Sequence, residues 1–439
     1  MKIQNKFPKY KEYKPSGNEW LGEIPVNWKI SKIKFIGKYI NGVAFKPEEW
    51  SVSGKKIIRI QNLSGESNIY NYFEGKKPKK YIIKKGDYLI SWSASLGFYE
   101  WDEEDNAWLN QHIFKVIPNN VLTINQFYKW LAFWFMEELK KEIHGSTMKH
   151  LTDNAFGSFI VYLPSFKEQQ FIAAFLDHET AKIDDLVSKY QRLILLLQEK
   201  RIALITHIVT RGLDPDVPLK DSGVRWLGKM PSHWQLHKLK HLSHLQFSSV
   251  DKISIEGELP VQLCNYTDVY KNEFITNCID FMNATGSRFE VEKSYITKGD
   301  VLVTKDSESW TDIVIPAYVM QNFYKKVLCG YHLALIRPNK FDGRYLFRAL
   351  QSKNINYQFQ IESNGITRYG IGKSSLGNGL IYTPPLSEQH SIADFLDRET
   401  AKIDDQVSKI ESLIIKMQEY RSALITAAVT GKIDVRGNS

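Results

Sequence analysis

The side chains best suited to chemistry in this sequence are basic. Six lysines fall within the ten residues from 76 to 85, a density that suits contacts with nucleic-acid phosphates, which supply affinity but no sequence information. Reading base edges requires side chains with paired donors or acceptors, such as arginine, asparagine and glutamine. For each candidate the alternative is an ordinary solvated surface. We predict nucleic-acid contacts by Lys55, Lys56, Arg59, Gln61, Asn62, Lys76, Lys77, Lys79, Lys80, Gln262, Asn265, Arg288, Lys305, Arg368 and Lys373.

Two segments approach known catalytic motifs but lack the residues that do the chemistry. Gly370-Ile-Gly-Lys-Ser-Ser375 is similar to a phosphate-binding loop, yet Thr367 stands where that loop needs its first glycine. Thr383-Pro-Pro-Leu386 is similar to the loop with which amino-methyltransferases bind an extruded base. It offers neither an amide or carboxylate for the exocyclic amine nor an aromatic ring for stacking. We therefore expect neither nucleotide binding nor methyl transfer by these segments.

Acidic pairs and clustered histidines are equally poor candidates for a site. The side chains of Asp184-Asp185 and Asp404-Asp405 would point about 100° apart on a helix, which favours a solvated face over a catalytic pair. The four histidines between positions 233 and 244 can lie on one helical face, but no cysteine or carboxylate completes a metal shell there. We predict no catalytic residue, no metal site and no cofactor bound by this chain.

The elements that would position the basic residues occur twice in the chain. Ser16-Gly-Asn-Glu-Trp-Leu-Gly22 recurs 206 residues later as Ser222-Gly-Val-Arg-Trp-Leu-Gly228, and thirteen of the fifteen residues from 175 to 189 recur 220 residues later. Between these blocks the halves diverge, with a few echoes such as His112 and His332. The chain therefore alternates a variable globule with a repeated helix, twice over.

Both repeated segments carry apolar residues in the 4-3 spacing of a coiled-coil seam, each with one arginine at the same point, Arg201 and Arg421. One such helix cannot bury its stripe alone, whereas two helices in one chain can pack together, and the connection through the second globule favours an antiparallel pair. The alternative is that each helix packs against its own globule. The predicted seam residues are Ile183, Val187, Tyr190, Ile194, Leu197, Leu204, Ile403, Val407, Ile410, Ile414, Met417 and Leu424.

Capping and turn signals divide the chain into parts. Ser165 and Glu168 form a capping box before the first long helix, Pro384-Pro385 precedes the second, and Gly212 and Gly431 suit the helix ends. The predicted parts are an N-terminal tail (1–15), a first globule (16–165), a first long helix (166–212), a second globule (213–385), a second long helix (386–434) and a C-terminal tail (435–439).

The predicted fold class is α+β, with two mixed α/β globules separated by two long helices that form a pseudo-twofold antiparallel coiled coil. Alternating apolar patterns indicate strands in the globules, and we predict that Trp92 and Trp108 belong to the core rather than to a base-stacking surface. The expected elements are strands at 55–61, 87–93, 300–304 and 331–337 and a helix at 126–143.

The composition is that of a folded protein whose net charge permits nucleic-acid binding. Hydrophobic residues make up 43% and charged residues 24% of the 439 residues, and the formal net charge is +9. No apolar run approaches the ~18 residues that a membrane helix needs, and the N-terminal segment lacks the apolar core of a secretory signal. The three cysteines are too far apart for a zinc or disulfide pattern. We expect a cytoplasmic protein without membrane contact.

Four motifs occur in order and mostly in duplicate. They are the two Ser-Gly-x-x-Trp-Leu-Gly blocks, Pro384-Pro-Leu-x-Glu388-Gln389, Ile392-Ala-x-Phe-Leu-Asp-x-Glu-Thr-Ala-Lys-Ile-Asp404 and Ala423-Leu-Ile-Thr-x-x-Val-Thr430. Together they make the chain resemble the specificity subunit of type I restriction–modification systems over nearly its whole length. The first copy departs at Leu163-Pro-Ser-Phe166, where Pro-Pro-Leu is usual, and this should alter only how the chain enters the helix.

The resemblance implies a division of labour. Each globule would be a target recognition domain that reads one half of a split, asymmetric sequence in double-stranded DNA, and the paired helices would set the gap between the halves. Two methyltransferase subunits, using S-adenosylmethionine to methylate adenine, would bind this scaffold together with restriction subunits that use ATP and Mg²⁺. The chain itself would be non-catalytic, and these cofactors would belong to its partners.

Two functions of other classes are the alternatives. A self-contained DNA methyltransferase or nuclease would need a cofactor fold with a glycine-rich turn, which the sequence lacks. A coiled-coil assembly protein without base readout would bind every duplex equally.

Overall fold

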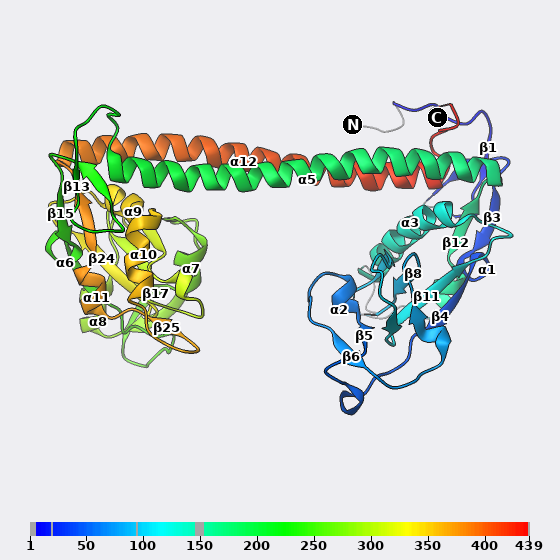
Figure 1. Ribbon diagram of the computed structural model, residues 1–439, viewed down its shortest axis with the longest axis horizontal. Helices are drawn as coiled ribbons and strands as arrows, with labels where there is room; N and C mark the ends of the chain where they lie inside the picture. The colour runs from blue at the N-terminus through cyan, green and yellow to red at the C-terminus, as the bar shows by residue number, and fades with distance from the viewer. Residues whose placement is uncertain (1–5, 19–20, 94, 145–152, 438–439) are drawn as a thin grey trace. The chain divides into compact units, whose positions relative to one another are not determined.

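The computed structural model of the protein describes residues 6–18, 21–93, 95–144 and 153–437 (Figure 1). The chain divides into two compact units, unit 1 with residues 1–190 and 412–439 and unit 2 with residues 191–411. Each unit combines a mixed α/β globule with part of two long helices, α5 (Phe166–Arg211) and α12 (Leu386–Val429). Among the described residues, no helix is long and apolar enough to span a membrane. Trp20 of the first repeated motif lies outside the described residues.

Short strands dominate the globule of unit 1. Its helices are α1 (Ile33–Ile36), α2 (Ile60–Leu63), α3 (Asn125–His144) and α4 (Asp153–Ser158), with 3-10 turns η2 (Pro47–Glu49) and η3 (Lys79–Tyr81). Its strands are β1 (Tyr13–Pro15), β2 (Glu23–Pro25), β3 (Lys29–Lys32), β4 (Gly37–Asn41), β5 (Lys55–Ile58), β6 (Asn71–Phe73), β7 (Ile82–Ile83), β8 (Tyr88–Ser91), β9 (Gly97–Glu100), β10 (Ala107–Leu109), β11 (Ile113–Pro118) and β12 (Ile160–Leu163).

The globule of unit 2 has the same character. Its helices are α6 (Leu239–Leu242), α7 (Tyr266–Lys271), α8 (Arg288–Ser294), α9 (Gly343–Gln351), α10 (Lys353–Ile361) and α11 (Lys373–Asn378), with the 3-10 turn η4 (Trp310–Asp312). Its strands are β13 (Leu219–Asp221), β14 (Lys229–Pro231), β15 (Gln235–Lys238), β16 (Ser243–Phe247), β17 (Leu259–Cys264), β18 (Phe274–Ile275), β19 (Met282–Gly286), β20 (Val301–Thr304), β21 (Asp306–Ser307), β22 (Pro316–Val319), β23 (Val327–Cys329), β24 (Leu333–Pro338), β25 (Tyr369–Gly370) and β26 (Leu380–Thr383).

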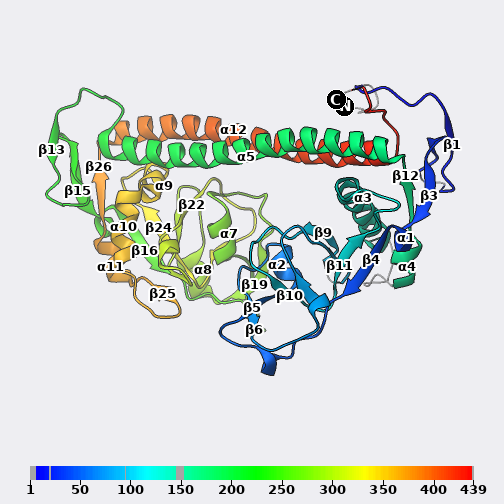
Figure 2. The ribbon, with the colours of Figure 1, turned by 45° about the vertical axis from the view of Figure 1, so that its right-hand side comes forward.

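The two globules share a plan although their sequences diverge. One sheet has the order β4-β11-β8-β9 in unit 1 and β16-β24-β20-β22-β18 in unit 2. A second sheet contains one parallel pair, β5 with β10 in unit 1 and β17 with β23 in unit 2. Figure 2 shows α3 and α9 between the strands of their own globule and the long helices. The predicted α+β class with two mixed globules is confirmed.

The long helices pack along the predicted seam and run antiparallel. In unit 1, Arg421 Nε of α12 lies 2.9 Å from Asp184 Oδ1 of α5. In unit 2, Arg201 Nε of α5 lies 2.8 Å from Asp404 Oδ1 of α12. The residue numbers add to 605 in both pairs. Residue numbers therefore rise along one helix in the direction in which they fall along the other. All twelve predicted seam residues are buried or half-buried, while every residue off the seam from 184 to 200 is exposed. The antiparallel coiled coil is confirmed.

The predicted start and stop signals lie at the ends of these helices. The backbone N–H of Glu168 donates to Ser165 Oγ at 3.4 Å, just before α5. The side chain of Glu168 bonds elsewhere, so only half of the predicted capping box forms. Gly212 and Gly431 follow the two helices with φ of +79° and +71°, a left-handed conformation that favours glycine.

Two leucines of α5 allow a test of the seam. Leu197 lies on it and is half-buried, whereas Leu195 is 51% exposed. Replacing Leu197 by Asp should cost about 2–4 kcal/mol of unfolding free energy, because it removes apolar burial and places a charge between the helices. Leu195→Asp is the matched control and should cost no more than about 1 kcal/mol. Chemical denaturation of the two variants measures the difference, and equal losses would contradict the seam.

Three details of the structure differ from the sequence analysis. The strand predicted at 55–61 ends at Ile58, because Asn62 Oδ1 accepts from the backbone N–H of Arg59 at 3.1 Å and starts the α2 turn. Trp108 is core as predicted, but Trp92 is only half-buried. The clustered histidines lie on the consecutive elements β15, α6 and β16 rather than on one helix. Among the described residues, no three histidine, cysteine or acidic side chains are gathered for a metal ion.

Candidate nucleic-acid interface

The repeated tryptophan motif joins each globule to the start of a long helix. The indole N–H of Trp28 donates to Glu168 at 3.1 Å, and that of Trp234 donates to Glu388 at 3.1 Å. Both indoles are fully buried. Because a buried donor or carboxylate is costly without a partner, each pair fixes the globule against its helix. The duplicated motifs are therefore structural rather than catalytic.

The glutamine after each of these glutamates makes a second connection. Gln169 Oε1 accepts from the backbone N–H of Ile124, and Gln389 Oε1 accepts from that of Asp342, each at 2.9 Å. These backbone positions immediately precede α3 and α9. The Glu-Gln motif thus sets the same register between globule and long helix in both units.

In unit 1 the parallel strands β5 and β10 end at the same side of their sheet. Arg59 follows β5, and Asn110 follows β10 with its N–H donating to the carbonyl of Ile58 at 3.3 Å. The ring of Trp92 lies there too, 5.0 Å from the ring of His112. Open sheets bind ligands beyond the carboxyl ends of parallel strands. We call this surface the recognition edge of unit 1, defined as Arg59, Gln61, Trp92, Asn110, Gln111 and His112.

Unit 2 has the same edge at the ends of β17 and β23. Gly330 N–H donates to the carbonyl of Cys264 at 2.9 Å, and a Cβ on Gly330 would lie 2.7 Å from that oxygen, so the close approach needs glycine. A cavity of about 170 Å³ opens here, and its lining includes Asn265, Tyr331 and His332. The recognition edge of unit 2 is defined as Asn265, Thr267, Lys305, Asp306, Tyr331, His332 and Arg368.

A chain of polar contacts runs along the edge of unit 2. Lys305 Nζ lies 2.5 Å from Asp306 Oδ2, and His332 Nδ1 lies 3.1 Å from the same oxygen. Arg368 Nη2 lies 3.2 Å from His332 Nε2. The exposed end of this series of contacts is the guanidinium of Arg368. A guanidinium is a forked donor suited to base edges and phosphates.

The two edges share a backbone and differ in side chains. The N–H of Trp92 donates to the carbonyl of His112 at 3.2 Å, and the N–H of Lys305 donates to that of His332 at 3.0 Å. At one and the same position, unit 1 therefore carries an aromatic side chain and unit 2 a cation. Two edges built alike but lined differently are suited to reading two different sequences.

Comparison with known proteins agrees with this duplication. The family model described as "Type I restriction modification DNA specificity domain" matches residues 25–193 and again 231–412. The chain belongs to this family. It is 20% identical to the EcoBI specificity subunit of Escherichia coli, over 93% of this chain and 86% of that protein. It is 21% identical to the MjaVIII specificity subunit of Methanocaldococcus jannaschii, over 94% of each.

A solved structure supports the fold of this specificity subunit. A chain from a study of complex assembly and conformational transition of the type I R-M system matches with a TM-score of 0.68 and 13% identity, over 93% of this chain and 99% of that one. The protein is a DNA sequence-specificity subunit of the type I family and not its catalytic subunit.

The predicted contact residues of unit 1 fall into two groups. Lys56 and Lys77 form ion pairs with Glu103 and Glu49 at 2.5 and 2.8 Å. The amide of Asn62 donates to backbone carbonyls in the loop that follows α2. These three side chains make contacts within the globule of unit 1. Arg59 and Gln61 are half-buried at the recognition edge, and the exposed lysines are Lys55, Lys76, Lys79 and Lys80.

In unit 2 the structure brings three predicted residues together, Asn265, Lys305 and Arg368, at the recognition edge of the specificity subunit. Arg288 and Lys373 are exposed at the starts of α8 and α11, and Gln262 is half-buried within β17. Sequence reasoning did not single out Asp306 or Tyr331. The echo between His112 and His332 was the signal available for this edge.

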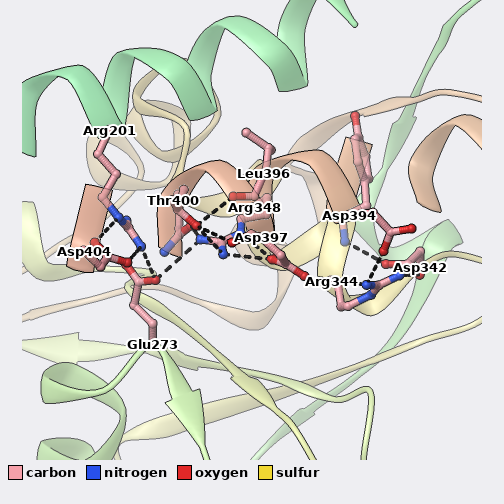
Figure 3. A network of polar contacts seen from close by, with 12 residues as sticks. Arg201, Glu273, Asp342, Arg344, Arg348, Asp394, Leu396, Asp397, Thr400 and Asp404 are labelled. Carbon is pink, nitrogen blue, oxygen red and sulfur yellow. Dashed lines mark hydrogen bonds and ion pairs between the residues drawn. The ribbon is translucent and has the colours of Figure 1, made fainter. Parts of the chain in front are cut away.

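A network of ion pairs joins the globule of unit 2 to the long helices (Figure 3). Arg348 of α9 is 1% exposed, and its guanidinium donates to Asp397 of α12 at 2.8 and 3.1 Å. Glu273 accepts from Arg201 of α5 at 2.6 Å. Burial opposes the charge of Arg201, but Glu273 and Asp404 outweigh it and raise the pKa of Arg201 above its ordinary value. Glu273 of the globule therefore forms an ion pair with Arg201 of the coiled-coil seam.

The corresponding joint of unit 1 has an indole where unit 2 has a guanidinium. The indole N–H of Trp130 in α3 donates to Asp177 of α5 at 2.9 Å. Arg421 of α12 stacks over the rings of Trp130 and Phe133, each 5.8 Å away. The same aspartate thus binds a neutral indole in one unit of the specificity subunit and a buried guanidinium in the other.

Proposed function

We propose that the chain reads a DNA sequence in two parts, each unit contributing one part through its recognition edge. The observation that carries this proposal is the repeated edge, which has one backbone arrangement and two sets of side chains. A uniform DNA clamp would gain nothing from such divergence, because phosphate contacts are alike at every sequence. The lysine-rich segment of unit 1 from 76 to 85 would add affinity beside its edge.

We also propose that two copies of one methyltransferase subunit bind the long helices. The solvent-facing ion pairs of α5 recur on α12: Asp185–Lys189 and Asp405–Lys409 both measure 2.7 Å. Two surfaces of equal chemistry suit two equal partners. Restriction subunits would join this assembly, and S-adenosylmethionine, ATP and Mg²⁺ would be bound by the partner subunits in the cytoplasm.

Photo-crosslinking of the assembled complex tests the role of the edges. Gln61 and Thr267 occupy corresponding positions in α2 and α7 and would carry the photoreactive side chain. Val121 and Lys340 are exposed controls beyond the opposite ends of β11 and β24. Six strand residues place these controls about 20 Å from the edges.

We expect the crosslinks from positions 61 and 267 to map to different halves of the recognised DNA, with none from positions 121 and 340. The target sequence comes from methylated adenines sequenced in cells that carry the chain and its partners. Crosslinks from the control positions alone, or both edge positions mapping to one half, would overturn the proposal.

A further inference from the structure

Arg368 is presented on a short loop that the structure closes firmly. The backbones of Asn364 and Gly370 exchange two hydrogen bonds of 3.0 and 2.9 Å. Gly365 has φ +146°, and a Cβ there would lie 1.9 Å from the carbonyl oxygen of Arg368. A Cβ on Gly370 would lie 2.9 Å from Asp306 Oδ1. The loop is therefore pressed against the recognition edge, and its backbone is fixed before any ligand arrives.

The contacts of His332 leave only one arrangement of its protons. A carboxylate accepts hydrogen bonds and a guanidinium only donates them. His332 must therefore donate from Nδ1 to Asp306, at 3.1 Å, and accept at Nε2 from Arg368, at 3.2 Å. The aspartate thus sets the tautomer that receives the arginine.

The positive charge of Arg368 is not neutralised by the contacts of His332 and Asp306. Asp306 already has a cation beside it, because Lys305 lies 2.5 Å away with a side chain only 12% exposed. Two cations and one carboxylate leave an excess of positive charge, carried by the exposed guanidinium of Arg368. Within the described parts of the chain, one of the five N–H groups of Arg368 is directed to His332, which leaves a fork of donors for a ligand.

We infer that Arg368 reads a guanine in the part of the sequence that unit 2 recognises, with His332 and Asp306 as its positioning residues. The inference rests on the proposed function. Guanine presents two acceptors, O6 and N7, to the major groove, and an arginine fork donates to both. Adenine offers a donor in place of O6 and would leave one N–H of the fork unpaired, which is the physical basis of discrimination.

Competition binding of the assembled complex to duplexes varied at each base pair measures this effect. Arg368→Ala should lower the preference for guanine at one base pair of one half-site by about 10- to 100-fold. Preferences in the other half-site should stay unchanged. Arg225→Ala, at an exposed arginine in the turn between β13 and β14, is the matched control and should alter no base preference.

A pair of histidine variants separates positioning from general stability. His332→Ala should weaken the same guanine preference, whereas His332→Gln should restore most of it, since a glutamine amide can donate to Asp306 and accept from Arg368. Arg368→Lys should not restore it, because lysine lacks the fork.

Three results would overturn the inference. Uniform weakening at all sequences, with a smaller salt dependence, would assign Arg368 to a phosphate. Equal losses in His332→Ala and His332→Gln would exclude the relay. Unchanged preferences in Arg368→Ala would exclude Arg368 as a reader; if position 267 still crosslinks to DNA, the proposed function survives, and if it does not, both fail.

Discussion

Replacing Asp397 by alanine is expected to destabilise unit 2 by about 3–5 kcal/mol, the loss typical of breaking a buried ion pair by removing one partner. Arg348 is 1% exposed and depends on Asp397 for its two closest carboxylate contacts, at 2.8 and 3.1 Å. The other carboxylate, Glu273, lies 3.5 Å away. Chemical denaturation followed by tryptophan fluorescence and circular dichroism measures the loss.

The matched control is Asp177→Ala in unit 1. There the same position of the repeat accepts a hydrogen bond from the neutral indole of Trp130 at 2.9 Å, so the expected loss is about 1–2 kcal/mol. A second control replaces the pair in unit 2, as Arg348→Met with Asp397→Leu, and should recover most of the stability because no buried charge remains unpaired. Equal losses at Asp177 and Asp397, or no recovery in the double variant, would contradict this account.

The long helices could be predicted from the sequence because their signals are local and occur twice. The 4-3 spacing, the glycines after each helix and the arginine in each seam lie on single helices, so spacing along the chain reports spacing in space. The sequence of one helix does not show what its apolar stripe packs against. The duplication does, since the second copy supplies a matching stripe. The Trp28–Glu168 pair could not be predicted as a contact, although both residues stood in repeated motifs 140 positions apart.

The recognition edges could be predicted only in part, for physical reasons. Asp306, His332 and Arg368 come from different elements, and the pairing of β20 with β24 and of β21 with β25 brings them together. No periodicity in the sequence records these pairings. The joint to the long helices could not be predicted for another reason. Trp130 and Arg348 donate to the same aspartate of the repeat with unlike side chains, so comparing the two copies gives no match. Divergence between copies therefore marks both the positions proposed to face DNA and this joint.

Removing one heptad from each long helix is expected to shorten the gap between the recognised half-sites. The segments to remove, 191–197 of α5 and 408–414 of α12, are matched by the sum of 605 that the ion pairs 184–421 in unit 1 and 201–404 in unit 2 share. Deleting both segments keeps the 4-3 spacing, since Arg201 then follows Tyr190 at the distance that Ile194 had. At about 1.5 Å per residue the helices shorten by about 10 Å, or about 3 base pairs.

The deletion should also weaken binding, because about 3 base pairs turn the DNA by about 100°, whereas one heptad turns a straight helix by only about 20°. Sequencing of methylated adenines in cells that carry the variant and its partners reports the new gap. Duplicating the same two segments should lengthen the gap by a similar amount while both half-sites stay the same. A gap that does not change in either variant would mean that the partner subunits, rather than α5 and α12, set the distance at which the two parts of the sequence are read.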